Sequence, residues 1–166
     1  TQPDTPLTAR VMANRIWHHL FGAGIVRTMD NFGATGARPT HPGLLDHLAV
    51  RFVGNDWSVK SMIREMVLSR AYQLSSDTAE ANAAADPNNR LLWRMNHKRL
   101  AAESLRDAML ATSGRLDRQP AGGSVVTKLG NVNIGRAQRQ LNQMQRNTSQ
   151  RSVYLPILRN ALPEMM

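Results

Sequence analysis

Residues 5–24 carry the clearest helical pattern in the chain. Apolar side chains recur there at spacings of three and four residues, which gathers them on one face of an α-helix. Thr5 can cap the first turn through its hydroxyl, and Pro6 suits the first helical position. Gly22 or Gly24 can adopt the left-handed conformation that ends a helix. The predicted buried face consists of Ala9, Met12, Ala13, Ile16, Trp17 and Leu20.

Two more amphipathic helices follow. The first starts at Thr40 or His41, with Pro42 in its first turn, and Gly54 is suited to end it. Its apolar stripe consists of Leu44, Leu45, Leu48, Ala49 and Phe52. Ser58 can cap the second helix through its hydroxyl. The stripe of that helix consists of Val59, Met62, Ile63, Met66 and Val67.

A fourth long helix is predicted from Lys98 to Ser113, with Gly114 at its end. Its inner face consists of Ala101, Leu105, Ala108 and Met109. The stretch 75–85 before it is either a ragged helix end or a loop. Pro87 then breaks the pattern, because the residue before a proline disfavours helical backbone. The next apolar residues are predicted to be buried, namely Leu91, Leu92, Trp93 and Met95.

The long apolar stripes end near residue 115. Residues 125–127 are compatible with a short strand, whereas residues 131–150 are rich in Asn, Gln and Arg and contain no aromatic residue. A segment with so little apolar surface does not offset its own ordering entropy, so we expect it to be mobile or ordered by a partner. Residues 151–160 regain β character, but Pro156 restricts them to an edge strand or an extended arm.

These patterns predict a mainly α fold. It is a single helical domain of about four principal helices, with a partly disordered, basic C-terminal third and at most one short edge strand. We divide it into a helical core over 1–117, a flexible connector over 118–150 and an extended arm over 151–166. A chain of 166 residues is long enough for a sizeable core. No apolar run approaches the roughly 18 residues of a membrane-spanning helix, so no span is predicted.

Positive charge is concentrated near the C-terminus. The chain has 21 Lys and Arg against 12 Asp and Glu, a net charge of +9. Residues 115–166 contain 8 of the basic residues and only 2 of the acidic ones, which gives them six of the nine net charges. Such a segment can bind a polyanion, either nucleic acid or acidic polysaccharide, or it can simply be solvated.

Polar side chains share a second face of the first predicted helix. They are Arg10, Asn14, Arg15 and His18. Because arginine binds carboxylates and phosphates in a bidentate manner, this face could hold an anionic group. Alternatively, it clamps the loop over 30–33, with Asp30 accepting from one of the arginines. We favour the clamp, because unsatisfied backbone groups in a buried loop are costly.

Glu103 and Asp107 form the strongest carboxylate pair in the sequence. Side chains four residues apart are neighbours on a helix, so the pKa of one carboxyl could be raised for acid–base chemistry. Arg99 and Arg106 lie close enough to pair with the carboxylates instead. We therefore favour a structural ion-pair cluster over a catalytic pair.

The chain contains no cysteine, which excludes disulfides, thiol catalysis and Cys-type zinc sites. Its five histidines lack metal-site spacing; His18 and His19, for example, point about 100° apart on a helix. The sequence also has no nucleophile elbow and no phosphate-binding loop. We predict no catalytic residues, no metal site and no cofactor on this chain.

Five stretches share an order and spacing with a known family. They are NRIWHHLFGAGIVRTMDNFG (14–33), HPGLLDHLA (41–49), WSVKSMIREMVLSRAYQLSS (57–76), RLAAESLRDAMLATSGRLD (99–117) and RSVYLPILRN (151–160). Together they resemble the planctomycete-type domain of unknown function that lies near the C-terminus of large exported proteins. The resemblance covers most of the chain except 131–150, and it carries no established activity.

The resemblance implies a setting for the domain. Relatives usually contain a second uncharacterised domain and often a c-type cytochrome module, so any haem would belong to that separate module. This chain has no C-x-x-C-H motif. The resemblance also implies an exported or cell-envelope location and a family pattern that continues beyond Met166.

Three functions remain open. The leading one is a non-catalytic structural or interaction module that contacts neighbouring domains of a larger, cytochrome-associated polypeptide. The second is a polyanion-binding module that uses the basic C-terminal third. The third is an enzyme domain built around Arg10, Asn14 and His18, with Glu103 or Asp107 as the carboxylate.

Overall fold

The computed structural model describes residues 6–120, 122 and 148–155. The chain is mainly helical, as predicted, and it divides into two compact units, Thr1–Lys98 and Arg99–Met166. The division therefore falls at residue 98, inside the range 1–117 that we predicted as one helical core. Within the described ranges the chain forms no strand, and none of its helices is long and apolar enough to cross a membrane.

The first unit begins with α1 (Pro6–Phe21), which starts at the proline predicted for the first helical position. The predicted capping residue, Thr5, lies outside the described residues. Gly22 ends the helix with a φ of +83°, a left-handed conformation that glycine adopts without strain. Its N–H donates to the carbonyl oxygen of His18 at 2.8 Å, which satisfies one of the free carbonyl groups at the helix end.

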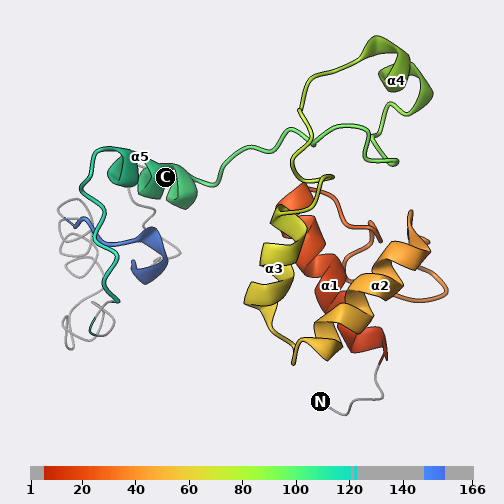
Figure 1. Ribbon diagram of the computed structural model, residues 1–166, viewed down its shortest axis with the longest axis horizontal. Helices are drawn as coiled ribbons and strands as arrows, with labels where there is room; N and C mark the ends of the chain where they lie inside the picture. The colour runs from red at the N-terminus through yellow and green to blue at the C-terminus, as the bar shows by residue number, and fades with distance from the viewer. Residues whose placement is uncertain (1–5, 121, 123–147, 156–166) are drawn as a thin grey trace, which may run out of the picture. The chain divides into compact units, whose positions relative to one another are not determined.

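α2 (Pro42–Gly54) and α3 (Val59–Val67) lie where the pattern predicted them. Of the predicted α3 stripe, however, only Met62 and Met66 are buried, whereas Val59 and Ile63 are exposed because they lie on the side of α3 away from the core. The Ser58 hydroxyl caps α3 by accepting a hydrogen bond from the Ser61 N–H at 3.3 Å. Between the two helices, Asp56 and Trp57 adopt φ values of +52° and +59°, which reverse the chain direction within a few residues. Both helices contact α1 as a result (Figure 1).

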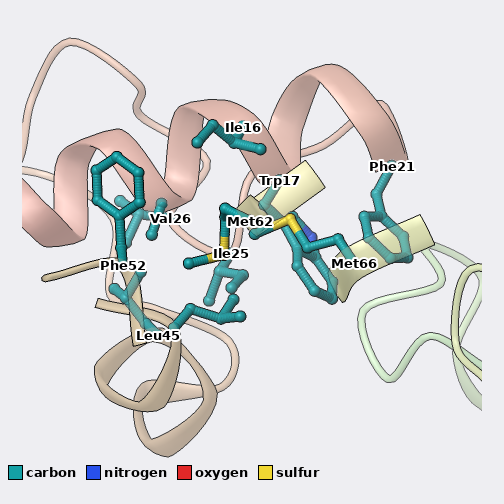
Figure 2. Close-up of a cluster of buried hydrophobic side chains, with 11 residues drawn as sticks. Ile16, Trp17, Phe21, Ile25, Val26, Leu45, Phe52, Met62 and Met66 are labelled. Carbon is teal, nitrogen blue, oxygen red and sulfur yellow. The ribbon is translucent and has the colours of Figure 1, made fainter. Parts of the chain in front are cut away.

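The core of this unit lies where the three helices meet (Figure 2). Trp17 and Phe21 of α1 stack with their ring centroids 3.8 Å apart. Ile25 and Val26, in the turn after α1, fold back onto the same cluster. The two other helices contribute Leu45, Leu48, Phe52, Met62 and Met66. Each large apolar side chain buried here stabilises the fold by about 1.5–3 kcal/mol, so these contacts hold the unit together.

The rest of the first unit is mostly loop. α4 (Glu80–Ala85) is a short helix without a buried residue, in the stretch predicted to be either a ragged helix end or a loop. The prediction that Leu91 is buried is wrong, because 73% of it is exposed. Its neighbours Leu92, Trp93 and Met95 are half-buried. Leu92 and Met95 pack against the core cluster, and polar contacts described below also hold this loop.

In the second unit, α5 (Ala102–Thr112) starts at Ala102 rather than at the predicted Lys98. Gly114 ends it with a φ of +71°, as its position predicted. An isolated parallel bridge pairs Asp117 with Gln150, and the 3-10 helix η2 (Ser152–Tyr154) follows. The predicted extended arm is therefore wrong over 152–154, where the backbone turns helically to contact α5.

Some predictions fall outside the described residues. These are the short strand over 125–127, the mobile segment over 131–147 and the arm beyond residue 155.

Candidate functional site

Asn14 on α1 is fully buried, with 0% of its surface exposed. Its Oδ1 accepts a hydrogen bond from the Val26 N–H at 2.9 Å, and its Nδ2 donates to the Val26 carbonyl oxygen at 3.0 Å. The same Nδ2 lies 3.3 Å from the sulfur of Met29. The side chain thus pairs both backbone groups of one residue in the turn after α1, and its burial keeps it from contacting a ligand.

Arg10 and Arg15, the two arginines on the predicted polar face of α1, have separate partners. Arg10 donates from Nε to Asp46 of α2 at 2.6 Å, and Arg15 lies 3.5 Å from Asp30. His18 is half-buried. Of the predicted loop 30–33, only Asp30 is held by this face; the clamped segment is instead 26–29, because Asn14 turns inward and Arg10 reaches a neighbouring helix.

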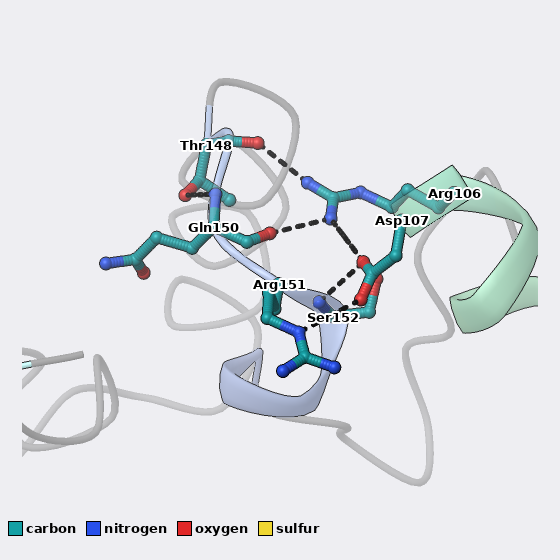
Figure 3. Close-up of polar contacts among 6 residues, drawn as sticks. All are labelled: Arg106, Asp107, Thr148, Gln150, Arg151 and Ser152. Atoms are coloured by element: carbon teal, nitrogen blue, oxygen red, sulfur yellow. Dashed lines mark hydrogen bonds and ion pairs between the residues drawn. The ribbon is translucent and has the colours of Figure 1, made fainter. Parts of the chain in front are cut away.

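Arg106 and Asp107 of α5 lie at the centre of a polar cluster in the second unit (Figure 3). Arg106 donates to the carbonyl oxygens of Thr148 and Gln150 at 2.7 and 3.0 Å. Asp107 Oδ1 accepts from the N–H and the hydroxyl of Ser152 at 2.8 and 2.7 Å. These bonds fix residues 148–152 against one side of α5.

The environment of Asp107 favours its charged form. Burial alone would raise the pKa of this carboxyl, but the Ser152 hydroxyl and N–H, followed by the charges of Arg106 and Arg151, lower the pKa below its usual value. A general acid at neutral pH needs the opposite shift. Among the described contacts, Arg99 and Glu103 take no part in this cluster. Glu103 lies in the first turn of α5, where the helix dipole stabilises a negatively charged carboxylate.

The apolar side of α5 faces outward. We define the α5 stripe as Ala101, Leu105, Ala108 and Met109, all of which are exposed. Leu105 is 51% exposed and Met109 58%, whereas the side chains of Arg106 and Asp107 are only 13% and 21% exposed. The prediction that this stripe packs into the core is therefore wrong, because residues 148–152 occupy the polar side instead.

A cavity of about 270 Å³ lies in the first unit, between the turn after α1 and the loop that precedes α5. Trp17, Ile25 and Leu92 form its apolar part. Polar side chains on its walls are Arg27, Thr40, His41, Asn88, Asn89, Arg90, Asn96 and His97. No Asp or Glu occurs among the lining residues in the described part of the chain.

The loop that forms one wall of this cavity is braced by its own side chains. The Asp86 carboxylate accepts from the Leu91 N–H at 2.7 Å, and Asn89 Nδ2 donates to the Arg94 carbonyl oxygen at 2.8 Å. The bonds from the Leu91 and Arg90 N–H groups lower the pKa of Asp86. Two wall residues, Asn89 and Leu92, have positive φ values of +49° and +57°.

The same loop is attached to the end of α1. Asn96 Nδ2 donates to the Phe21 carbonyl oxygen at 2.9 Å, and the Lys98 ammonium donates to the carbonyl oxygen of His19. Both bonds satisfy carbonyl groups that the helix leaves without an intrahelical partner. The cavity was not predicted from the sequence, although Asn88 and Asn89, directly after Pro87, indicate a loop with many hydrogen-bonding groups.

Two further predictions concern polyanion binding by the basic residues over 115–166 and the absence of a metal site. Of the eight basic residues over 115–166, only Arg115, Arg118 and Arg151 are among the described residues, so the polyanion prediction rests on sequence. Within the ranges that the structure describes, no three His, Asp or Glu side chains gather as a metal site would require.

Comparisons with known proteins give the chain a family but no reaction. Searches among curated proteins and among solved structures returned no match to it. A family model does match, over residues 1–166 and thus over the whole chain. The domain that carries the α5 stripe and the braced cavity therefore belongs to the PSD1 family, described as a protein of unknown function (DUF1553).

Proposed function

We propose that this domain is a non-catalytic interaction module, and that the α5 stripe docks an amphipathic helix from another part of the same, longer polypeptide. The observation that carries the proposal is the inverted packing of α5. Its charged residues Arg106 and Asp107 are the more buried ones, while Leu105 and Met109 are more than half exposed. A surface helix of a folded domain normally has the reverse arrangement.

The energetics favour a partner for this face. Covering a Leu or Met side chain completely contributes about 1.5–3 kcal/mol, and Leu105 and Met109 lie one helical turn apart on the same face. Hydrogen bonds from Arg106 and to Asp107 attach α5 to residues 148–152 and so restrict rotation of the helix about its own axis. The stripe is therefore held in an orientation that presents it to a partner.

The pattern of the stripe favours a helix as that partner. Two small residues, Ala101 and Ala108, alternate with the two large ones, and such an alternation suits interdigitation with the side chains of a second helix. The 11 residues of α5 span about 16 Å, room for about three turns of contact.

The resemblance to the planctomycete-type domain supports a partner within the same polypeptide. It implies large exported proteins with a neighbouring uncharacterised domain and often a separate c-type cytochrome module, which would hold any haem. An exported location is part of this proposal and follows from the resemblance. The role of the domain in such a protein is to position a neighbour.

Single-cysteine labelling tests the proposal, because the chain contains no cysteine of its own. Leu105→Cys places a thiol on the stripe, and Ser104→Cys places a matched thiol on an exposed position of α5 outside it. In the 166-residue chain both thiols should react with maleimide at similar rates. In the longer polypeptide, Leu105→Cys should react at least about tenfold more slowly, whereas Ser104→Cys should be unchanged.

Equal labelling of Leu105→Cys in the two proteins would overturn the proposal. So would a dimer of the 166-residue chain that Leu105→Glu converts to a monomer in sedimentation experiments, because the occupant would then be a second copy. A comparison of both variants by circular dichroism excludes unfolding as the cause of any difference.

A further inference from the structure

We infer that the cavity of the first unit binds a compact, hydroxylated anion, a molecule of about monosaccharide size that carries one carboxylate, sulfate or phosphate group. This inference is independent of the proposed docking at α5, since every residue that lines the cavity lies in the unit Thr1–Lys98. It rests on the charge, the shape and the bracing of the cavity.

Charge is the first argument. Arg27 and Arg90 line the cavity from opposite elements, the turn after α1 and the braced loop. Asp86 is not a lining residue and accepts from the Leu91 N–H, but it lies close enough for the charges of Arg90 and Arg27 to help lower its pKa. One carboxylate against two guanidinium groups leaves an excess of positive charge at the cavity. A guanidinium group offers several N–H donors in a plane, which suits the oxygens of an oxyanion.

The remaining lining groups fit hydroxyls. The Asn88 amide can donate and accept hydrogen bonds, and the Thr40 hydroxyl, which donates to the Ile25 carbonyl oxygen, can still accept one. The amides of Asn89 and Asn96 are bonded within the loop and to the end of α1, so they shape the wall. Trp17, Ile25 and Leu92 provide an apolar patch, which suits the C–H face of a small ring. The volume of about 270 Å³ lies just below the roughly 300–1,000 Å³ of sites for drug-sized ligands, so the ligand is compact.

Bracing is the third argument. Asn89 and Leu92 hold left-handed backbone conformations, which for a leucine are rare and costly. The hydrogen bond that Asp86 accepts and those that Asn89 and Asn96 donate hold the loop in this shape and attach it to the end of α1. A wall that its own hydrogen bonds keep in a strained conformation is preorganised, so binding does not require the loop to be ordered first.

Isothermal titration calorimetry with four probes tests the inference: sulfate, phosphate, glucuronate and its neutral analogue glucose. The wild-type chain should bind glucuronate at least tenfold more tightly than glucose, and sulfate or phosphate should compete with it. Arg27→Gln and Arg90→Gln should each weaken glucuronate binding at least tenfold. Arg64→Gln changes an exposed arginine of α3 that does not line the cavity, and it should bind as the wild type does.

Three results would overturn the inference. They are equal affinity for glucose and glucuronate, no binding of any probe, or glucuronate binding that survives in both cavity variants. Arg27 contacts the Asn88 carbonyl oxygen at 3.4 Å, and the amide that Arg27→Gln introduces is still a hydrogen-bond donor, so this variant should remain folded. Unchanged circular dichroism and thermal unfolding of both variants would establish that a lost affinity reflects the cavity and not the fold.

Discussion

At the scale of single residues, buried polar side chains determine how the loops of this domain are held. Asn14 pairs with both backbone groups of Val26, and Asp86 and Asn89 hold the loop that walls the cavity. Each of these side chains replaces water as a partner for backbone groups that packing removes from solvent. Removing one leaves those backbone groups unsatisfied, which makes such positions sensitive to substitution.

Asn14→Ala should lower the free energy of unfolding by about 1–3 kcal/mol, because the Val26 N–H and carbonyl groups lose their buried partner. Denaturant unfolding measures this change. Arg15→Ala is the control: its ion pair with the 93% exposed Asp30 side chain should contribute less than about 1 kcal/mol. A loss as large for Arg15→Ala as for Asn14→Ala would contradict this account of the loop.

Trp17→Ala should be more costly than either, at about 3–5 kcal/mol, because Trp17 is 5% exposed and stacks on Phe21. The same unfolding experiment measures it. A change below about 1 kcal/mol would show that the Trp17 ring is not part of the core.

Asp107 should titrate at a pKa below its usual value of about 3.9, because it accepts two hydrogen bonds from Ser152. A carboxyl whose pKa is lower in the folded state stabilises the fold above about pH 4, and this contribution is lost as the pH falls through the folded pKa. Carbon NMR of the side-chain carboxyl measures the value directly. Ser152→Ala should raise the pKa toward the usual value; an unchanged pKa in that variant would show that the hydroxyl does not contribute.

At the scale of elements, helix periodicity located the helices well, and capping residues located several of their ends. Ser58 and Gly114 are confirmed in the roles that their types predict. Periodicity found the α5 stripe too, but it cannot tell which side of a helix meets the rest of its unit. That depends on residues 148–152, more than 35 positions further along the chain, whose polar groups bind Arg106 and Asp107.

The same limit applies to Asn14 and to the cavity. The sequence placed Asn14 on a polar face, and the turn at Val26 covers that part of the face in the folded chain. The cavity joins residues 22–27 to 88–97, two segments that no local pattern relates. Local periodicity does not predict contacts between segments that are far apart in the sequence.

The exposed α5 stripe gives a prediction for the isolated chain. Leu105→Glu should change the free energy of unfolding by less than about 0.5 kcal/mol, since a surface substitution removes little packing. Met62→Ala, at a fully buried position of α3, should cost about 2–5 kcal/mol. A loss of similar size for Leu105→Glu would mean that the stripe is covered within this chain.

At the scale of the whole molecule, the core of α1, α2 and α3 and the cavity both belong to the unit Thr1–Lys98. A fragment of residues 1–98 should therefore fold by itself, with cooperative denaturant unfolding and a protected Trp17. A fragment that stays unfolded while the 166-residue chain folds would show that the two units depend on each other for stability.

The central claim is that the α5 stripe is a docking face for another part of a longer polypeptide. Hydrogen exchange over residues 102–112 tests it most directly, with residues 9–17 of α1 as the internal reference. The account predicts fast exchange of α5 in the 166-residue chain and exchange slowed by at least about tenfold in the longer polypeptide, with α1 unchanged. Identical exchange of α5 in the two proteins would contradict it.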